Sequence, residues 1–163
     1  MEHFVGIDLH KDVSQMAVLR ESRSPSQLRF ANDVMTAEQV LKKLPKGSKI
    51  AVEAMGSWWW MVELAQKTGH EVFLSHPKQT KAIASARLKS DKVDALMLAK
   101  LLKADLLPTV WIPPEKQRHV FNLRYYDEMP YDEMSKILDT SAGALKASYH
   151  HAAKKIEEFI LNN

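Results

Sequence analysis

The sequence predicts an α/β fold, with a mixed sheet and flanking helices, followed by a small all-α unit. Three observations predict it. Residues 1–30 are dominated by short apolar runs typical of strands, residues 36–106 alternate helical and strand patterns, and residues 117–161 carry only helical patterns. Because strands followed by alternating helices and strands build a mixed sheet, we expect two domains, 1–116 and 117–163.

The first part of the chain is expected to supply five strands and two helices. Gly, Pro and Ser residues separate the apolar runs and predict a hairpin connection at 22–26. Thr36 is a candidate cap for the first helix, and Gly69 is a candidate C-terminal cap residue for the second. The expected strands are 4–9, 13–19, 27–30, 49–54 and 71–74, and the expected helices are 37–44 and 57–68.

Two more helices are expected beyond Pro77, at 78–88 and 90–106, with Ser90 placed to cap the second. The proline-containing stretch 108–114 then reads as an extended connector that precedes the domain boundary. The element order βββ-α-β-α-β-α is the topology of a ribonuclease-H-like sheet, in which three antiparallel strands are continued by parallel ones.

The remainder of the chain is expected to be helical. Apolar residues recur at helical spacing over 117–127, 131–138 and 142–161, and residues 139–141 form a tight turn between the last two helices. Two short helices, a short turn and a longer helix make a helix-turn-helix pattern.

Composition places the chain among ordinary globular proteins and limits its chemistry. It has 163 residues, with 45% hydrophobic and 26% charged side chains. Without cysteine it forms neither disulfides nor thiolate zinc sites, which suits a reducing cytoplasm. No apolar run reaches the roughly 18 residues of a membrane helix, so no membrane partner is expected.

Basic side chains are in excess only in the first 116 residues, and the net charge of the chain is +3. The densest basic run consists of Lys78, Lys81, Arg87, Lys89 and Lys92. On charge alone, such a run is a solvated helix face. Its position beside two aspartates favours a second interpretation, in which it contacts a nucleic-acid backbone.

Four carboxylates are placed so that they can converge. Asp8 and Glu53 end strands expected to be neighbours, whereas Asp91 and Asp94 lie three apart on one face of an expected helix. Carboxylates brought together raise one another's pKa, and hard divalent cations such as Mg²⁺ and Mn²⁺ relieve the repulsion. Two such ions can stabilise both the attacking and the leaving oxygen of a phosphodiester displacement. The alternatives are salt bridges to lysines for the strand acids and plain surface charge for the helix pair.

Several motifs, in their order and spacing, resemble those of the DEDD insertion-sequence transposases, relatives of the pilin-gene-inverting recombinases. They are GIDLHK at 6–11, VEAMG at 52–56, HP at 76–77, KSDKVDA at 89–95 and WIPP at 111–114. The resemblance covers residues 4–115 and implies a RuvC-like domain of the ribonuclease-H-like fold. It also implies Mg²⁺ or Mn²⁺ as cofactor and a structured guide RNA that bridges donor and target DNA. The catalytic and metal-binding residues it implies are Asp8, Glu53, Asp91 and Asp94.

In that family the RuvC-like domain is followed by a coiled coil and by a domain with a nucleophilic serine. Neither is expected in this chain, because Ser135, Ser141 and Ser148 read as surface and capping residues of the helix-turn-helix. We therefore expect a truncated transposase-type protein, for which metal-dependent phosphodiester chemistry and nucleic-acid binding alone are the two alternatives.

The run Trp58-Trp59-Trp60 occupies most of a helix circumference, so its three rings cannot all face one core. We expect one or two of them to be core anchors. Packing plus a protein interface, and with it a homo-oligomer, is favoured over base stacking for the run.

In a helix-turn-helix the second helix lies in the major groove of DNA. The helix 142–161 offers Lys146, Ser148, His151 and Lys154 for DNA contacts. The segments VFNLRYY at 120–126 and SAGALKASYHH at 141–151 are similar to the promoter-reading region of extracytoplasmic-function sigma factors, where glycine is common at the position of Asp139. This resemblance implies contacts with duplex DNA and with RNA polymerase. A plain three-helix packing module is the alternative.

Three functions are compatible with these features. The first is a cytoplasmic, nucleoid-associated transposase-type protein with a magnesium-dependent acidic site that acts in DNA transposition or recombination. The second is a non-catalytic DNA-binding regulator, in which the RuvC-like domain is a remnant or a scaffold. In the third, the C-terminal segment serves chiefly folding or solubility.

Overall fold

The computed structural model describes residues 2–21, 23–54, 58–88 and 93–161. The chain divides into two compact units, Met1–Trp111 and Ile112–Asn163. Among the described helices, none combines the length and the apolar character needed to cross a membrane.

The first unit is built on a six-stranded mixed sheet of order β3-β2-β1-β4-β5-β6. Its strands are β1 (Phe4–Leu9), β2 (Val13–Arg20), β3 (Arg23–Ala31), β4 (Lys49–Glu53), β5 (Glu71–Ser75) and β6 (Thr109–Val110). The pairs β1–β2 and β2–β3 are antiparallel, β1–β4 and β4–β5 are parallel, and β6 runs antiparallel to β5. The mixed α/β architecture agrees with the expectation of a ribonuclease-H-like sheet.

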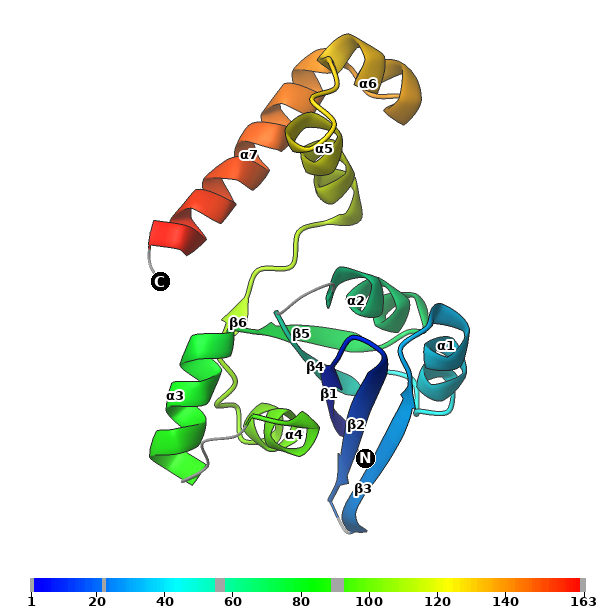
Figure 1. The fold of residues 1–163 in the computed structure, drawn as a ribbon, viewed down its shortest axis with the longest axis vertical. Coiled ribbons are helices and arrows are strands. Elements are labelled where there is room, and N and C mark those ends of the chain that lie inside the picture. The colour runs from blue at the N-terminus through cyan, green and yellow to red at the C-terminus, as the bar shows by residue number, and fades with distance from the viewer. Residues whose placement is uncertain (1, 22, 55–57, 89–92, 162–163) are drawn as a thin grey trace. The chain divides into compact units, whose positions relative to one another are not determined.

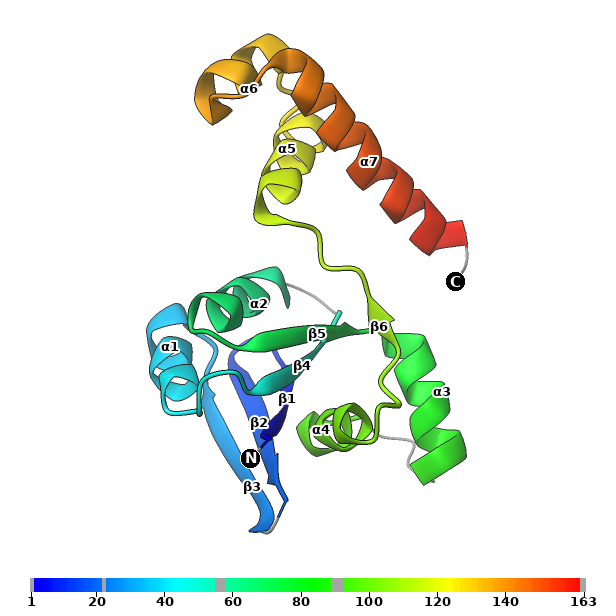
Figure 2. The same cartoon turned by 180° about the vertical axis from the view of Figure 1, so that it is seen from behind.

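Helices cover both faces of this sheet. Helices α1 (Val34–Lys42) and α2 (Trp58–Lys67) lie on one face, and α3 (Pro77–Leu88) and α4 (Ala95–Lys103) on the other (Figures 1 and 2). Helix α4 packs against β1, β2 and β4 through a buried cluster formed by Phe4, Leu19, Ala51, Leu98, Ala99 and Leu102. Helix α3 packs on α4 through Ala84, which contacts Met97 and Leu101. The central strands and α4 therefore share one core.

Two strand predictions were incomplete. β3 begins at Arg23, so the expected hairpin connection at 22–26 is mostly strand and Pro25 lies inside it. Proline is tolerated because β3 is an edge strand and Pro25 falls where the register of β2 and β3 is irregular, between the pairs formed by Arg23 and Ser26. The stretch read as a connector contributes β6, a short strand that covers the other edge of the sheet.

Two predicted helix starts were wrong, and both errors concern the cap. Helix α1 begins at Val34, because the carboxylate of Asp33, not Thr36, caps it; the Thr36 N–H donates to Asp33 Oδ1 at 2.9 Å. Helix α4 begins at Ala95 with Asp94 as its N-cap, five residues later than expected. Ser57, the expected first residue of α2, and the expected cap Ser90 lie outside the described residues.

Helix α2 buries Met61, Val62 and Ala65. The rings of Trp58 and Trp60 are half-buried, and Trp59 is 49% exposed. Two of the three rings are thus partly covered and the third is exposed, while the fully buried positions of α2 belong to the residues that follow them. The anchoring role of one or two tryptophans stays a prediction.

The second unit is a three-helix arrangement of α5 (Glu115–Tyr125), α6 (Tyr131–Leu138) and α7 (Ala142–Leu161). Its core is formed by Val120, Met134 and Leu145, one from each helix. Helices α6 and α7 have the bounds that the sequence predicted, and α5 begins two residues earlier than expected.

Candidate functional site

Asp8 and Glu53 are brought side by side by the sheet. β1 and β4 are parallel neighbours whose register pairs Gly6 with Ala51 and Ile7 with Val52, so Asp8 and Glu53 are the next positions on the two strands. Burial, and then the negative charge of Asp8, raise the pKa of Glu53 above its ordinary value. The two carboxylates therefore interact at the carboxyl ends of neighbouring strands.

The third predicted acid, Asp94, reaches the same face of the sheet through a close helix contact. Gly6 has no side chain, and a Cβ atom there would overlap the carbonyl oxygen of Ala95 and lie 2.7 Å from the backbone nitrogen of Ala99. Asp8 is two residues beyond Gly6 and shares its face, because side chains alternate along a strand. The start of α4, with Asp94 as its cap, therefore lies over β1 next to the acidic pair.

The predicted geometry of Asp94 was wrong in detail. Asp94 has an extended backbone (φ −129°) and precedes the helix, so it is not one of two aspartates on a helical face. Its Oδ1 accepts a hydrogen bond from the Met97 N–H at 2.9 Å. The fourth predicted acid, Asp91, lies outside the described residues.

Three neighbours of the acidic pair were not predicted as site residues. His10 Nε2 lies 3.1 Å from Asp8 Oδ2, which is an ion pair whenever the imidazole is protonated. Ser75 on β5 pairs directly with Glu53 on β4, and its buried hydroxyl has no hydrogen-bond partner among the described residues. Gln15 on β2 pairs with Asp8. The proximity of Ser75 and Gln15 depends on strand register, which the sequence pattern alone does not supply, whereas His10 follows Asp8 by two residues.

The predicted basic run falls partly on α3. Lys78 and Lys81 are exposed on this helix. Lys89 and Lys92, as well as the side chain of Arg87, lie outside the described residues.

In the second unit, a turn at 139–141 joins α6 to α7. Asp139 adopts a left-handed conformation (φ 46°, ψ 50°), and the Ser141 hydroxyl oxygen accepts the Ala144 N–H at 3.3 Å at the start of α7. Lys146, His151 and Lys154 are exposed on α7, whereas Ser148 is half-buried.

Comparison with known proteins places this geometry in a family. A family model described as a transposase, that of the IS110-type DEDD transposases, matches residues 5–149. The chain belongs to the IS110-type DEDD transposase family. "Putative transposase y4qE" of Sinorhizobium fredii (strain NBRC 101917 / NGR234) is 28% identical over 121 residues, which make up 70% of this chain and 31% of that protein. The chain thus spans about a third of the length of this relative.

The family match extends beyond the ribonuclease-H-like unit. It ends at residue 149, within α7, and so includes α5 and α6. Most of the unit for which the sequence suggested a sigma-factor origin is therefore matched by the transposase family as well.

The acidic residues of this DEDD transposase fit divalent cations. Asp8 and Glu53 offer carboxylate oxygens from rigid, adjacent strand ends, and Asp94 offers a third carboxylate from the start of α4. Oxygen donors of this kind are the ligands that Mg²⁺ and Mn²⁺ prefer. The pKa of Glu53 is raised first by burial and then by the charge of Asp8, and a bound cation would oppose both effects.

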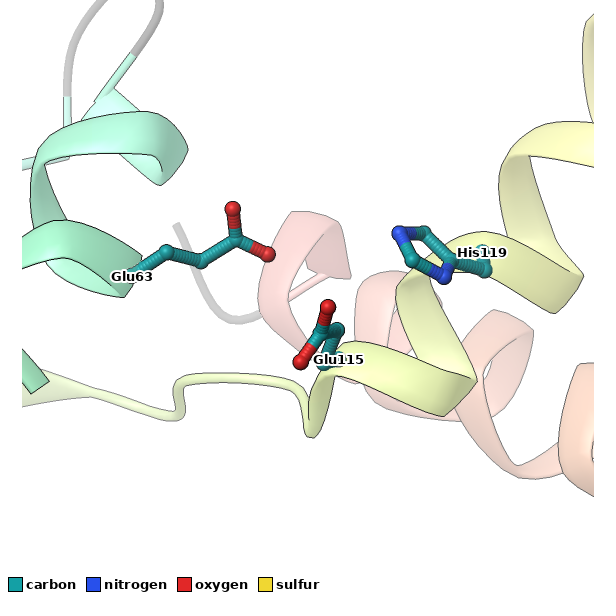
Figure 3. Close-up of side chains that lie close together, drawn as sticks. All are labelled: Glu63, Glu115 and His119. Carbon is teal, nitrogen blue, oxygen red and sulfur yellow. The ribbon is translucent and has the colours of Figure 1, made fainter. Parts of the chain in front are cut away.

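A second pair of ligand side chains occurs on α5. Glu115 and His119 lie one turn apart on this helix, and both are exposed (Figure 3). Two ligands are fewer than the three or four protein ligands of a zinc site. Glu63, also drawn in Figure 3, belongs to α2 of the first unit and is not counted with them.

Proposed function

We propose that this DEDD transposase family member holds divalent cations, Mg²⁺ or Mn²⁺, at Asp8, Glu53 and Asp94, with Asp91 as the expected fourth acid, and acts on DNA in transposition or recombination. The observation that carries the proposal is the register that sets Asp8 beside Glu53, with the pKa of Glu53 raised by burial and by Asp8. When bound, the cations would supply charge stabilisation for phosphodiester displacement.

The residues of the chain itself have defined parts in this function. The strand ends hold Asp8 and Glu53 in place without loop motion, and the Gly6 contact fixes the start of α4 above them. The Met97 N–H occupies Oδ1 of Asp94 and so orients that carboxylate. The exposed Lys78 and Lys81 on α3 are proposed to contact the phosphate backbone.

Thermal unfolding with and without Mn²⁺ tests this proposal. A ligand that binds only the folded state stabilises it by about 2.7 kcal/mol at a hundredfold excess over its Kd. We expect Mn²⁺ to raise the Tm of the parent chain and to lose most of this effect in Asp8→Asn and Asp94→Asn. Asp33→Asn is the matched control, because Asp33 is also an N-cap aspartate but lies on α1, across the sheet. An equal Mn²⁺ effect in all variants, or none in the parent, would contradict the metal site.

A second candidate function is duplex DNA binding by the second unit. The observation that favours it is the charge of α7, where Lys146, Lys154 and Lys155 have no acidic residue among them before Glu157. On this proposal α7 lies in the major groove, with Lys146 and Lys154 on phosphates and Ser148 and His151 near base edges. A non-catalytic DNA-binding regulator, in which only this unit acts, is the corresponding alternative for the whole chain.

Electrophoretic mobility shift or anisotropy with duplex DNA tests the second candidate. Lys146→Ala with Lys154→Ala is expected to weaken binding and to reduce its salt dependence. Each single variant is compared with Lys136→Ala on α6, which removes the same one charge. Binding that is unchanged in the double variant would leave α7 without a role in DNA contact. Contacts with a guide RNA and with RNA polymerase remain predictions of the two resemblances, and contact with a second copy of the chain remains a prediction from the tryptophan run.

A further inference from the structure

A row of polar residues crosses the sheet on the face covered by α4. Antiparallel register pairs Asp8 with Gln15 and Gln15 with Arg29. Paired residues on neighbouring strands point to the same face. Arg29, Gln15, Asp8 and Glu53 thus lie on four successive strands, and Arg29 is about 10 Å from Asp8 at the usual spacing of two strands.

Two residues of this row, Gln15 and Arg29, line a pocket. A cavity of about 230 Å³ beside the start of α4 is bounded by both the edge strand and the helix. Its polar lining consists of Gln15, Gln27, Arg29 and Asp94. The cavity therefore extends from Asp94 at the start of α4 to β3, which is the first strand in the sheet order.

Charge is distributed unevenly along this row. The carboxylates of Asp8 and Glu53 are on its central strands, whereas the cation of Arg29 is at the edge and is exposed. Within the part of the chain that the structure describes, Arg29 is in no salt bridge, and the neutral Gln15 separates it from Asp8. A guanidinium presents several N–H donors in a planar fork that fits phosphate oxygens.

We propose that Arg29 and Gln15 form a subsite for a backbone phosphate of the nucleic-acid strand whose neighbouring phosphodiester lies at the acidic site. The inference rests on the proposed function, because it takes the acidic residues as the point of reaction. The nucleic-acid strand then crosses the sheet from α4 toward β3. One of its phosphodiesters lies at the metal-binding acids, and a neighbouring phosphate lies at Arg29. Arg29 is a binding and positioning residue, since its guanidinium contacts the strand away from the reacting bond.

Fluorescence anisotropy of short labelled oligo(dT) and oligo(U), titrated at several salt concentrations, tests the subsite. Each phosphate contact to a single strand contributes about 0.7 to the slope of log affinity against log salt. We expect Arg29→Gln to lower affinity by about tenfold, the effect of one charge-assisted contact, and to reduce the slope by about 0.7. Arg29→Lys keeps the charge and is expected to keep the slope while losing part of the affinity.

Lys43→Gln is the matched control, because Lys43 is an exposed cation at the end of α1, on the opposite face of the sheet. The titrations are repeated with Lys146 and Lys154 both replaced by glutamine, so that nucleic-acid binding by α7 does not mask the effect of Arg29→Gln. A loss of affinity and of salt slope in Arg29→Gln with oligo(dT), oligo(U) or both supports the subsite and shows whether it binds DNA or RNA. An Arg29→Gln variant that matches the parent in slope and affinity, or a parent chain that binds neither strand, overturns it.

The two proposals fail in different ways. If Mn²⁺ does not stabilise the parent chain while Arg29→Gln still reduces the salt slope, the metal site fails and the phosphate subsite stands. If Mn²⁺ stabilises the parent chain and Arg29→Gln changes nothing, the subsite fails and the metal site stands.

Discussion

Gly6 on β1 lies directly against the backbone of Ala95 at the start of α4. A Cβ atom at Gly6 would overlap the Ala95 carbonyl oxygen and lie 2.7 Å from the Ala99 nitrogen, and both are backbone atoms that a rotamer change cannot move. Asp8 follows Gly6 by two residues, and Asp94 precedes Ala95. The closest approach of helix and sheet in this region therefore also sets the distance between two of the candidate ligands.

Gly6→Ala is expected to destabilise the first unit by about 3 kcal/mol or more, because α4 must shift away from β1 and its buried side chains lose contacts. Urea unfolding followed by circular dichroism measures the change. Gly143→Ala is the control for the general effect of the substitution, since a Cβ at Gly143 on α7 meets no atom within 4 Å. That variant is expected to gain up to about 1 kcal/mol from helix propensity. A Gly6→Ala variant as stable as the parent would show that the close approach is not required.

Asp94→Ala is expected to lower stability by about 1 kcal/mol, because the Met97 N–H loses the carboxylate that accepts its hydrogen bond. Asp94→Asn is expected to cost little, since an asparagine oxygen caps equally well. Thermal unfolding in EDTA compares the two. If both variants lose the same stability, the charge of Asp94 matters in the metal-free protein and capping alone does not describe its role.

Glu53→Gln is expected to stabilise the metal-free protein at neutral pH. The pKa of Glu53 is raised in the folded state, by burial and then by Asp8, so the folded protein keeps a proton that the unfolded chain releases above about 4.5. Stability is thus lost as the pH rises through the folded-state pKa, and an uncharged glutamine avoids this loss. The gain is expected to be below about 1 kcal/mol, because Glu53 is half-buried and water screens its charge.

Unfolding curves across a pH series in EDTA measure this effect, and the gain from Glu53→Gln should vanish as the pH falls below 4.5. Glu38→Gln is the control, because Glu38 is a solvent-exposed partner of Lys42 on α1 and should show no such gain. A pH-independent difference for Glu53→Gln would mean that packing, and not charge, is responsible.

The elements that the sequence predicted best are those whose ends are marked by residue type. Gly69 was expected to close α2, and it adopts φ 90° while the His70 N–H donates to the Ala65 carbonyl. Helix α4 ends in the same way, with Asp105 at φ 55° and the Leu106 N–H donating to the Leu101 carbonyl. Because aspartate is a weaker stop signal than glycine, the end of α4 was placed three residues too late.

The candidate site was predictable only where an acidic residue stands at the end of an apolar strand. An acid at the end of an apolar strand marked both Asp8 and Glu53, and adjacent parallel strands then bring them together. Gln15, Arg29 and Ser75 have ordinary polar patterns along the chain, and they join the row only through pairing between strands. Register depends on packing across the whole sheet, which a single-strand pattern does not contain.

Asp139→Gly is expected to stabilise the second unit by about 0.5–1 kcal/mol, because Asp139 holds a left-handed backbone (φ 46°) that costs an L side chain energy and glycine nothing. Asp139→Val is expected to destabilise it by about 1–2 kcal/mol, since a β-branched residue tolerates this conformation poorly. Thermal unfolding followed by circular dichroism measures both. Thr140→Gly, next in the turn and outside the positive-φ residues, is the control and should not stabilise. If Asp139→Gly and Asp139→Val are equally stable, the turn between α6 and α7 relaxes without requiring the left-handed conformation.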